Sequence, residues 1–245
     1  KDSCSEISFD LKFLGPKGPK QKIWMNIVSS ISKEDNMLHN ITYLILPSGD
    51  ILVNSRIISD PKSKLTPPPR IGLSGTLVME SGKLESGYLQ WLGLGPDSTY
   101  QGSVGGRNVG RYFKQMGEGK SVNQVNADYL VAAEGNLSPM SFTPSKTMFN
   151  PGILLTSLKE PVKFTACSDW HKEINMREQH MEKSGLKFHI DANQGLADVA
   201  PNFKKGREYS VAFRLRPLGL LLTGEPKAEE LARQDFSEHY DDLFA

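Results

Sequence analysis

Apolar and polar residues alternate along several stretches of the chain, and the first of these lies near its beginning. The stretch EISFDLKFL spans residues 6–14, and every second residue in it is apolar: Ile7, Phe9, Leu11 and Phe13. A period of two is typical of a β-strand with one buried face. The breaker GPKGPK follows, and IWMNIVSSI at 23–31 then predicts a second strand.

The next pair of apolar runs predicts a β-hairpin. ITYLIL at 41–46 and ILVNSRII at 51–58 are rich in residues that favour strands, and they flank the short segment PSGD. Proline and glycine supply the backbone angles that such a turn needs. We therefore expect a meander of four strands by residue 58.

Further strands are expected in the later apolar runs. GTLVMESGKLESGYLQWLGL at 75–94 has short runs broken by Ser-Gly pairs, a pattern that predicts a second hairpin. Between residues 93 and 121 the pattern is lost and glycine is frequent, so we expect a long loop there. Additional strands are predicted at 127–134, 152–158, 162–168, 186–191 and 208–217.

Two segments carry the period of a helix instead. The segment 169–185 ends on a glycine, and the segment 226–240 begins on a proline, a residue favoured in the first helical turn. Two helices are too few to serve as the crossovers that parallel strands require. The sequence therefore predicts a mainly β fold, an antiparallel sandwich or barrel-like sheet with two peripheral α-helices at about 169–185 and 226–240.

The segment SDPKSKLTPPPR at 59–70 bears on the number of domains. Its three consecutive prolines cannot donate hydrogen bonds to a sheet. We expect residues 1–245 to form one β-rich domain. A boundary at 59–70 would instead separate an N-terminal meander, 1–58, from a main part, 71–245.

The charge balance narrows the classes of partner. The 245 residues include 29 Lys and Arg and 28 Asp and Glu. Such a balance creates no overall field that would attract nucleic acid or an anionic membrane. No apolar run reaches the roughly 20 residues needed to cross a bilayer. We therefore expect no nucleic-acid partner and no transmembrane segment.

The chain start and the cysteines suggest export. The sequence starts at Lys1, as it would after removal of a signal peptide. Cys4 and Cys167 are too far apart for a zinc site or a CxxC motif. We expect either a long-range disulfide between them or a buried free thiol at Cys167. Membrane attachment is expected only if Cys4 carries a lipid. The expected location is periplasmic, cell-surface or secreted.

The stretch FHIDANQGLAD at 188–198 holds candidate ligands for a hard cation, namely Asp191, Asn193 and Asp198. Calcium binds oxygen ligands of this kind, but the EF-hand pattern fails because its sixth position would be Leu196 instead of glycine. The same residue types are preferred in a turn after a strand. We therefore expect a turn and no cofactor, with a calcium site as the alternative.

The glycine-rich region 93–121 holds candidate partner-binding residues. They are cationic or aromatic, as residues that dominate protein interfaces often are: Tyr100, Arg107, Arg111, Tyr112 and Lys114. The acidic and aromatic end DFSEHYDDLFA at 235–245 is a second candidate surface. It is equally compatible with a helix that docks on its own domain.

No catalytic motif is present in the sequence. MGEGKS at 116–121 lacks the earlier glycine of a phosphate-binding loop, because Lys114 stands at that position, and GLSG around Ser74 lacks the spacing of a nucleophile elbow. We therefore assign no catalytic residue. The sequence predicts an exported, non-enzymatic binding protein that acts through surface loops on a protein partner. The alternative is a secreted or periplasmic hydrolase or lyase that acts on a glycan or cell-envelope substrate.

Overall fold

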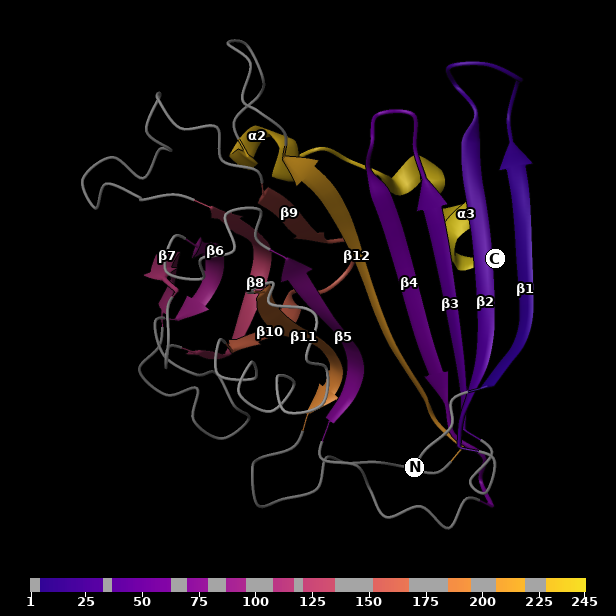
Figure 1. Ribbon diagram of the computed structural model, residues 1–245, viewed down its shortest axis with the longest axis horizontal. Coiled ribbons are helices and arrows are strands. Elements are labelled where there is room, and N and C mark those ends of the chain that lie inside the picture. Colours follow the sequence, from indigo (N-terminus) through magenta and orange to yellow (C-terminus); the bar gives the residue numbers. More distant parts are fainter. Residues whose placement is uncertain are drawn as a thin grey trace, which may run out of the picture.

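The computed structural model describes ten segments of the chain: residues 5–32, 37–62, 70–78, 87–95, 108–116, 121–134, 152–167, 185–194, 206–218 and 228–245. Within them, the strands form one twelve-stranded sheet whose pairings are all antiparallel. Figure 1 shows that this sheet curls on itself, with a tall flat part on one side and a tightly curved part on the other. The predicted mainly β, barrel-like antiparallel fold is thereby confirmed.

The flat part is the predicted meander. It comprises β1 (Ser5–Leu14), β2 (Lys22–Ser32), β3 (Met37–Ile45) and β4 (Ile51–Ile58). The turn between β3 and β4 is closed by a hydrogen bond from the Leu46 amide to the Asp50 carbonyl, and Gly49 has a φ of 86° that glycine adopts without strain. The predicted hairpin is therefore confirmed.

The strand β12 (Glu208–Leu218) connects the flat part to the curved part. It pairs with β4 on one side and with β9 (Gly152–Ser157) on the other. A strand from the later part of the chain thus pairs with a strand from the first 58 residues. The single domain and its alternative, a boundary at 59–70, both stay predictions.

The curved part is organised around the long strand β8 (Ser121–Glu134). Along one edge, β8 pairs first with β10 (Val162–Cys167) and then with β9, while β6 (Gly87–Gly95) pairs with its other edge. Beyond β10 follow β11 (Gly185–Gln194) and β5 (Arg70–Val78), and beyond β6 follows β7 (Asn108–Gln115). Because β9 and β10 share one edge of β8, the sheet branches at β8: β9 leads to β12 and the flat part, whereas β10 leads to β11 and β5.

The main hydrophobic core lies inside this fold. It joins residues of the flat part, such as Ile41 and Val53, to residues of the curved part, such as Trp91 and Phe164. Burial of this apolar surface is the main force that holds the curled sheet closed. Its fully or nearly fully buried members include Leu89, Val125, Leu130, Leu155, Ile190 and Phe213.

Two glycines allow neighbouring strands to approach where the pairing is irregular. A Cβ atom at Gly93 would lie 1.9 Å from the Asn126 carbonyl oxygen, and one at Gly72 would lie 2.1 Å from the Ile190 carbonyl oxygen. The register shifts beside both contacts, between Leu92 and Gly93 and opposite Gly72 in β11. Any larger residue would force these strands apart.

The expectation of a second hairpin at 75–94 is wrong. β5 and β6 both exist, but β5 pairs with β11, whereas β6 pairs with β7 and β8. Alternation of apolar residues predicts each strand but carries no information about its neighbour. Pairing is decided by the core that each strand faces.

The predicted C-terminal helix is broken into short pieces: α2 (Ala228–Ala232), the 3-10 turn η2 (Ser237–His239) and α3 (Tyr240–Phe244). At the break, the Asp235 carboxylate accepts hydrogen bonds from the amide and the hydroxyl of Ser237. Such local side-chain bonds compete with a continuous helix. The predicted helix at 169–185 lies outside the described residues, apart from Gly185 at the start of β11.

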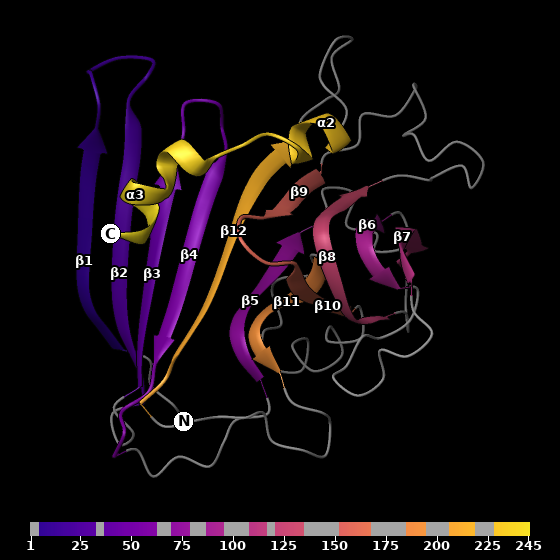
Figure 2. The same ribbon diagram turned by 180° about the vertical axis from the view of Figure 1, so that it is seen from behind.

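The C-terminal segment docks on its own sheet, so the second of the two expectations for residues 235–245 holds. Figure 2 shows α3 lying across one face of the flat part. Leu243 is fully buried against Leu44 and Leu52. The Trp24 indole donates a hydrogen bond of 3.0 Å to the Asp242 carbonyl, which fixes α3 on that face.

Candidate binding surfaces

The predicted partner-binding region is only partly a loop, because β7 crosses it. Arg111, Tyr112 and Lys114 lie on this strand, whereas Tyr100 and Arg107 lie outside the described residues. The signal for a strand was weak. Val109, Tyr112 and Phe113 favour strands, but Gly110 and Arg111 interrupt them and glycines precede them.

The two faces of β7 have different roles. Tyr112 is opposite Trp91, with ring centroids 5.6 Å apart, and its hydroxyl donates a hydrogen bond to the Asn108 carbonyl. Tyr112 therefore packs toward the core and anchors the strand. Lys114 shares this face but is exposed at its end.

The outer face of β7 carries exposed apolar residues beside a cation. Val109 is 69% exposed and Phe113 is 38% exposed, and the exposed Arg111 lies between them on the same face. We call these three residues the β7 surface. It lies on an edge strand, because among the described strands β7 pairs with β6 alone.

A second exposed apolar row lies on β1, at the opposite end of the sheet. Alternation predicted this strand correctly, and its period implied a buried apolar face. The exposed fractions are instead 49% for Phe9, 47% for Leu11 and 61% for Phe13. The sequence could not show that β1 is an edge strand whose apolar face extends beyond the core.

A pocket of about 390 Å³ lies where α3, the β9–β10 turn and β11 meet. Its charged lining is balanced between cations and acids: Arg56, Lys159 and Lys163, with Glu160, Asp191 and Glu208. The Arg56 Nε atom is buried and has no hydrogen-bond partner among the described residues. This lining suits a small polar ligand and selects no particular class.

One of the three predicted cation ligands, Asp191, lies in the lining of this pocket. Asp191 is 4% exposed and lines the pocket from β11. The strand continues to Gln194, so Asn193 lies in the ladder opposite Ile71 and not in a turn. Asp198 lies outside the described residues, and no group of three potential metal ligands occurs within the described part of the chain. The calcium site stays a prediction.

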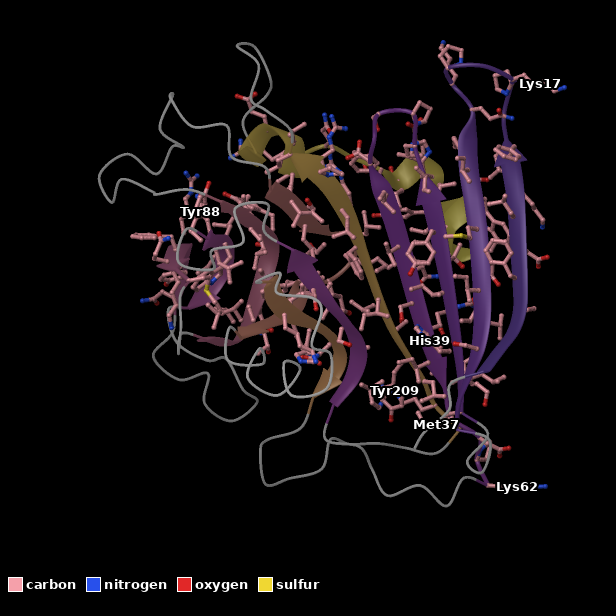
Figure 3. All side chains as sticks on the ribbon, in the orientation of Figure 1. Lys17, Met37, His39, Lys62, Tyr88 and Tyr209 are labelled. Atoms are coloured by element: carbon pink, nitrogen blue, oxygen red, sulfur yellow. The ribbon has the colours of Figure 1, made fainter. Side chains whose placement is uncertain are left out.

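A hydrogen-bonded pair, His39 and Ser55, was not anticipated from the sequence. The His39 Nε2 atom lies 2.8 Å from the Ser55 hydroxyl, which is 1% exposed. Burial lowers the pKa of His39 from its ordinary value. The lowered pKa favours the neutral imidazole at pH 7, and the side chain makes a partly buried polar contact between β3 and β4. Figure 3 shows His39 near Met37 and Tyr209.

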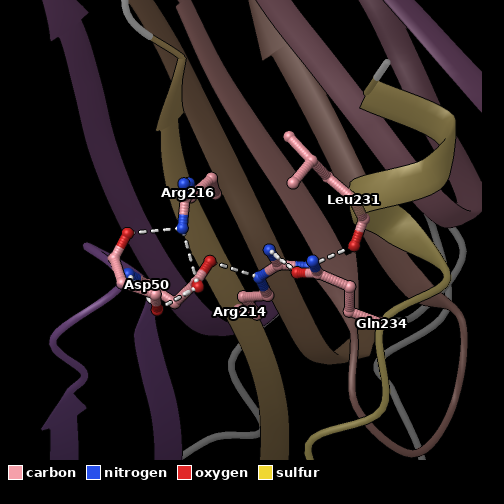
Figure 4. A network of polar contacts seen from close by, with 6 residues as sticks. Asp50, Arg214, Arg216, Leu231 and Gln234 are labelled. Atoms are coloured by element: carbon pink, nitrogen blue, oxygen red, sulfur yellow. Dashed lines mark hydrogen bonds and ion pairs between the residues drawn. The ribbon is translucent and has the colours of Figure 1, made fainter. Parts of the chain in front are cut away.

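The most buried ions form a structural network (Figure 4). The Arg214 Nε atom donates a 2.6 Å hydrogen bond to Asp50, and its other nitrogens donate to the Leu231 carbonyl and the Gln234 side chain. Arg216 bonds the second carboxylate oxygen of Asp50 at 2.9 Å. Burial lowers the pKa of Arg214, whereas the hydrogen bond and charge of Asp50 raise it. This network ties β12 to the β3–β4 turn and to α2, and its saturated contacts leave little capacity for a ligand.

The cysteines are not brought into a described contact. Cys4 lies outside the described residues, and Cys167 is the last residue of β10. The disulfide and the lipid attachment both stay predictions. No helix in the described part of the chain is long and apolar enough to cross a membrane.

The fold and these surfaces define a curled antiparallel β-sheet protein with exposed apolar edge strands. No protein-family model and no curated protein sequence matches the chain. A function must therefore be argued from the geometry of the surfaces themselves.

Proposed function

We propose that the protein is a non-enzymatic binding protein that takes a protein partner along β7. The observation that carries the proposal is the β7 surface, where two exposed apolar side chains flank Arg111 on an edge strand. Apolar groups with an interspersed arginine are typical of the residues that dominate protein interfaces. The proposal keeps Arg111 from the predicted partner-binding set, assigns Tyr112 to the scaffold, and adds Val109 and Phe113.

An edge strand offers a second source of affinity besides its side chains. Its outer backbone amides and carbonyls can pair with an added strand, a common mode of peptide recognition. The spacing of the β7 surface favours a partner segment that is apolar opposite Val109 and Phe113. Opposite Arg111 the segment would carry an acidic side chain. The partner class that fits is therefore an extended segment with alternating apolar and acidic residues.

The test is a native pull-down from the source cell, followed by affinity measurements on the stoichiometric partner. Arg111→Glu is expected to weaken the complex by about 10-fold or more, because it places like charges opposite each other. Lys62→Glu is the matched control, since Lys62 is exposed at the end of the molecule far from β7 (Figure 3). Equal affinity for both variants would contradict the proposal.

The alternative function, a hydrolase or lyase acting on glycan or cell-envelope substrate, is favoured by the pocket around Asp191. A carboxyl group with 4% exposure in a polar pocket is a candidate for acid–base chemistry. Turnover of such a substrate that Asp191→Asn abolishes would support this function. Turnover that survives the substitution, or its absence in the native protein, would count against it. Export is expected for both functions and stays a proposal.

A further inference from the structure

The outer edge of β1 is a second unpaired edge, separate from the β7 surface. β1 is the first strand of the sheet, and no described strand pairs with its outer side. In Figures 1 and 2, β1 and β7 lie at opposite ends of the molecule. A partner bound at the outer edge of β1 would therefore occupy a site separate from the β7 surface.

The exposed apolar row on β1 continues a row of half-buried residues on β2. Leu11 is opposite Met25, and Phe13 is opposite Ile23. Long, apolar edge strands are rare in soluble monomers, because they promote pairing with another chain. The row therefore points to a partner strand that extends the sheet.

The regular part of this edge is short and has a defined centre. A register shift between Glu6 and Ser8 interrupts the strand at one end, and Gly15, with a φ of 86°, turns the chain at the other. A bulge breaks the ladder on which a new strand would pair. The usable edge is therefore residues 8–14, and its midpoint is Leu11.

We propose that the partner of this edge is a second copy of the chain, whose β1 pairs antiparallel with the first about a two-fold axis at Leu11. Such an axis stands perpendicular to the sheet and keeps every side chain on its own face. Leu11 then lies opposite Leu11 of the other copy. Phe9 lies opposite Phe13, and this aromatic pair occurs twice.

Charge complementarity selects the same register. With the axis at Leu11, Asp10 of each copy lies opposite Lys12 of the other, on the face where α3 packs. Lys12 is held on this face by Trp24, whose ring centroid is 4.6 Å from the ammonium group. Moving the axis to Asp10 would place two aspartates opposite each other, and moving it to Lys12 would place two lysines opposite each other.

The resulting dimer has one continuous sheet across both copies. The two β7 strands lie at its far ends, so the dimer would present two copies of the β7 surface. A partner with two binding segments would then bind with increased avidity. The dimer itself does not depend on the function proposed for β7.

Charge variants test the register by sedimentation analysis of the full chain. Asp10→Lys and Lys12→Asp are each expected to weaken the dimer by about 10- to 100-fold, because each places two like-charge pairs across the interface. An equimolar mixture of the two variants is expected to dimerise again, since each then faces its complement. Lys62→Glu and Arg111→Glu are controls that should leave dimerisation unchanged.

Cysteine variants test the same register by covalent trapping. Directly opposed Cα atoms lie about 4.5–5.5 Å apart, within the range of a disulfide. Leu11→Cys is therefore expected to form a disulfide dimer under mild oxidation, confirmed by mass spectrometry of the linked peptide. Phe9→Cys alone should not, because the two positions lie about 13 Å apart along the strands. A mixture of the Phe9→Cys and Phe13→Cys chains should form a disulfide dimer, because these two positions lie opposite each other in the proposed register.

Several outcomes would overturn the proposal. A native chain that stays monomeric at concentrations up to about 1 mM would exclude self-pairing and leave the edge to a strand of another protein. A dimer that survives both charge variants would use another surface. A disulfide between two Phe9→Cys chains that forms in preference to one between two Leu11→Cys chains would reject the register.

Discussion

Arg214 connects three parts of the chain through one side chain. It is fully buried on β12, pairs with Asp50 in the β3–β4 turn, and donates a hydrogen bond to the Leu231 carbonyl in α2. Its guanidinium also lies 4.4 Å from the Phe236 ring. A buried ion pair is not strongly stabilising in itself, but loss of one partner leaves an uncompensated charge.

Removal of the Asp50 charge should therefore be costly. We expect Asp50→Asn to lower the free energy of unfolding by about 3–5 kcal/mol, because Arg214 would remain buried without its counter-ion. Urea denaturation measures the change. Lys22→Gln is the matched control, since the Lys22–Asp242 pair is partly exposed and should contribute about 1 kcal/mol or less. Equal effects of the two variants would contradict this account of the network.

His39 gives the stability of the protein a dependence on pH. Burial lowers the pKa of His39 in the folded chain, whereas in the unfolded chain it titrates near 6.5. Below this pH the unfolded state binds a proton that the folded state does not bind, so stability falls as the pH falls through 6.5 toward the folded pKa. At pH values well above 6.5, His39 is neutral in both states and does not change the stability with pH.

We expect His39→Gln to reduce the loss of thermal stability between pH 7 and pH 5. The amide can still reach Ser55 but does not take up a proton between pH 7 and pH 5. Some loss will remain, because burial and the charge of Lys22 also lower the pKa of His239. The test measures the melting temperature of the native protein and of His39→Gln from pH 7 to pH 5. An equal fall in both proteins would rule out His39 as a source of the pH dependence.

Among the elements, strand positions were predictable and strand environments were not. The period of two located β1 and β12, and runs of strand-favouring residues between turn signals located β2, β3 and β4, because both are local properties of the sequence. They could not show that the apolar row of β1 faces solvent or that β5 and β6 pair with other strands. Both depend on how the sheet curls, which is set by contacts between distant residues.

The same holds for the candidate surfaces: the sequence suggested which residues matter but could not show where their side chains lie. Composition placed Arg111 and Tyr112 in one functional group, but the strand geometry sends them to opposite faces. Asp191 was chosen as part of a turn, yet it lies in a strand and lines a pocket with residues far away in sequence. Residue type suggested the positions, and only the pairing of strands showed where each side chain lies in the fold.

The docked helix α3 is a structural element that can be tested by itself. We expect Leu243→Ala to lower the free energy of unfolding by about 2–5 kcal/mol, because Leu243 is fully buried among Leu44 and Leu52. Asp241→Ala, on the exposed side of the same helix, should cost less than about 1 kcal/mol. Urea denaturation measures the free energy of unfolding of both variants. Similar losses in the two would contradict the packing of Leu243 against the sheet.

At the scale of the whole molecule, the described part of the curled sheet closes around a main hydrophobic core and carries exposed apolar residues on the edge strands β1 and β7. The core joins the flat and curved parts, and β12 with its Arg214 network links them. The two edges, β1 and β7, differ in charge pattern. Asp10 and Lys12 alternate with the apolar row of β1, which favours the proposed self-pairing, whereas the β7 surface carries the cation Arg111, which favours the proposed acidic segment. The two proposals, a partner segment along β7 and a second copy along β1, both place binding at the sheet edges and leave the interior to stability.

Site-specific photo-crosslinking tests this account most directly. A photoreactive amino acid replaces Val109, the most exposed apolar residue of the β7 surface, and Lys62 in a control protein. Both are irradiated in extract of the source cell and analysed by mass spectrometry. The account predicts one protein crosslinked at position 109, through a segment of alternating apolar and acidic residues, and not at position 62. Crosslinks that are absent at 109, or the same at both positions, would contradict binding through β7.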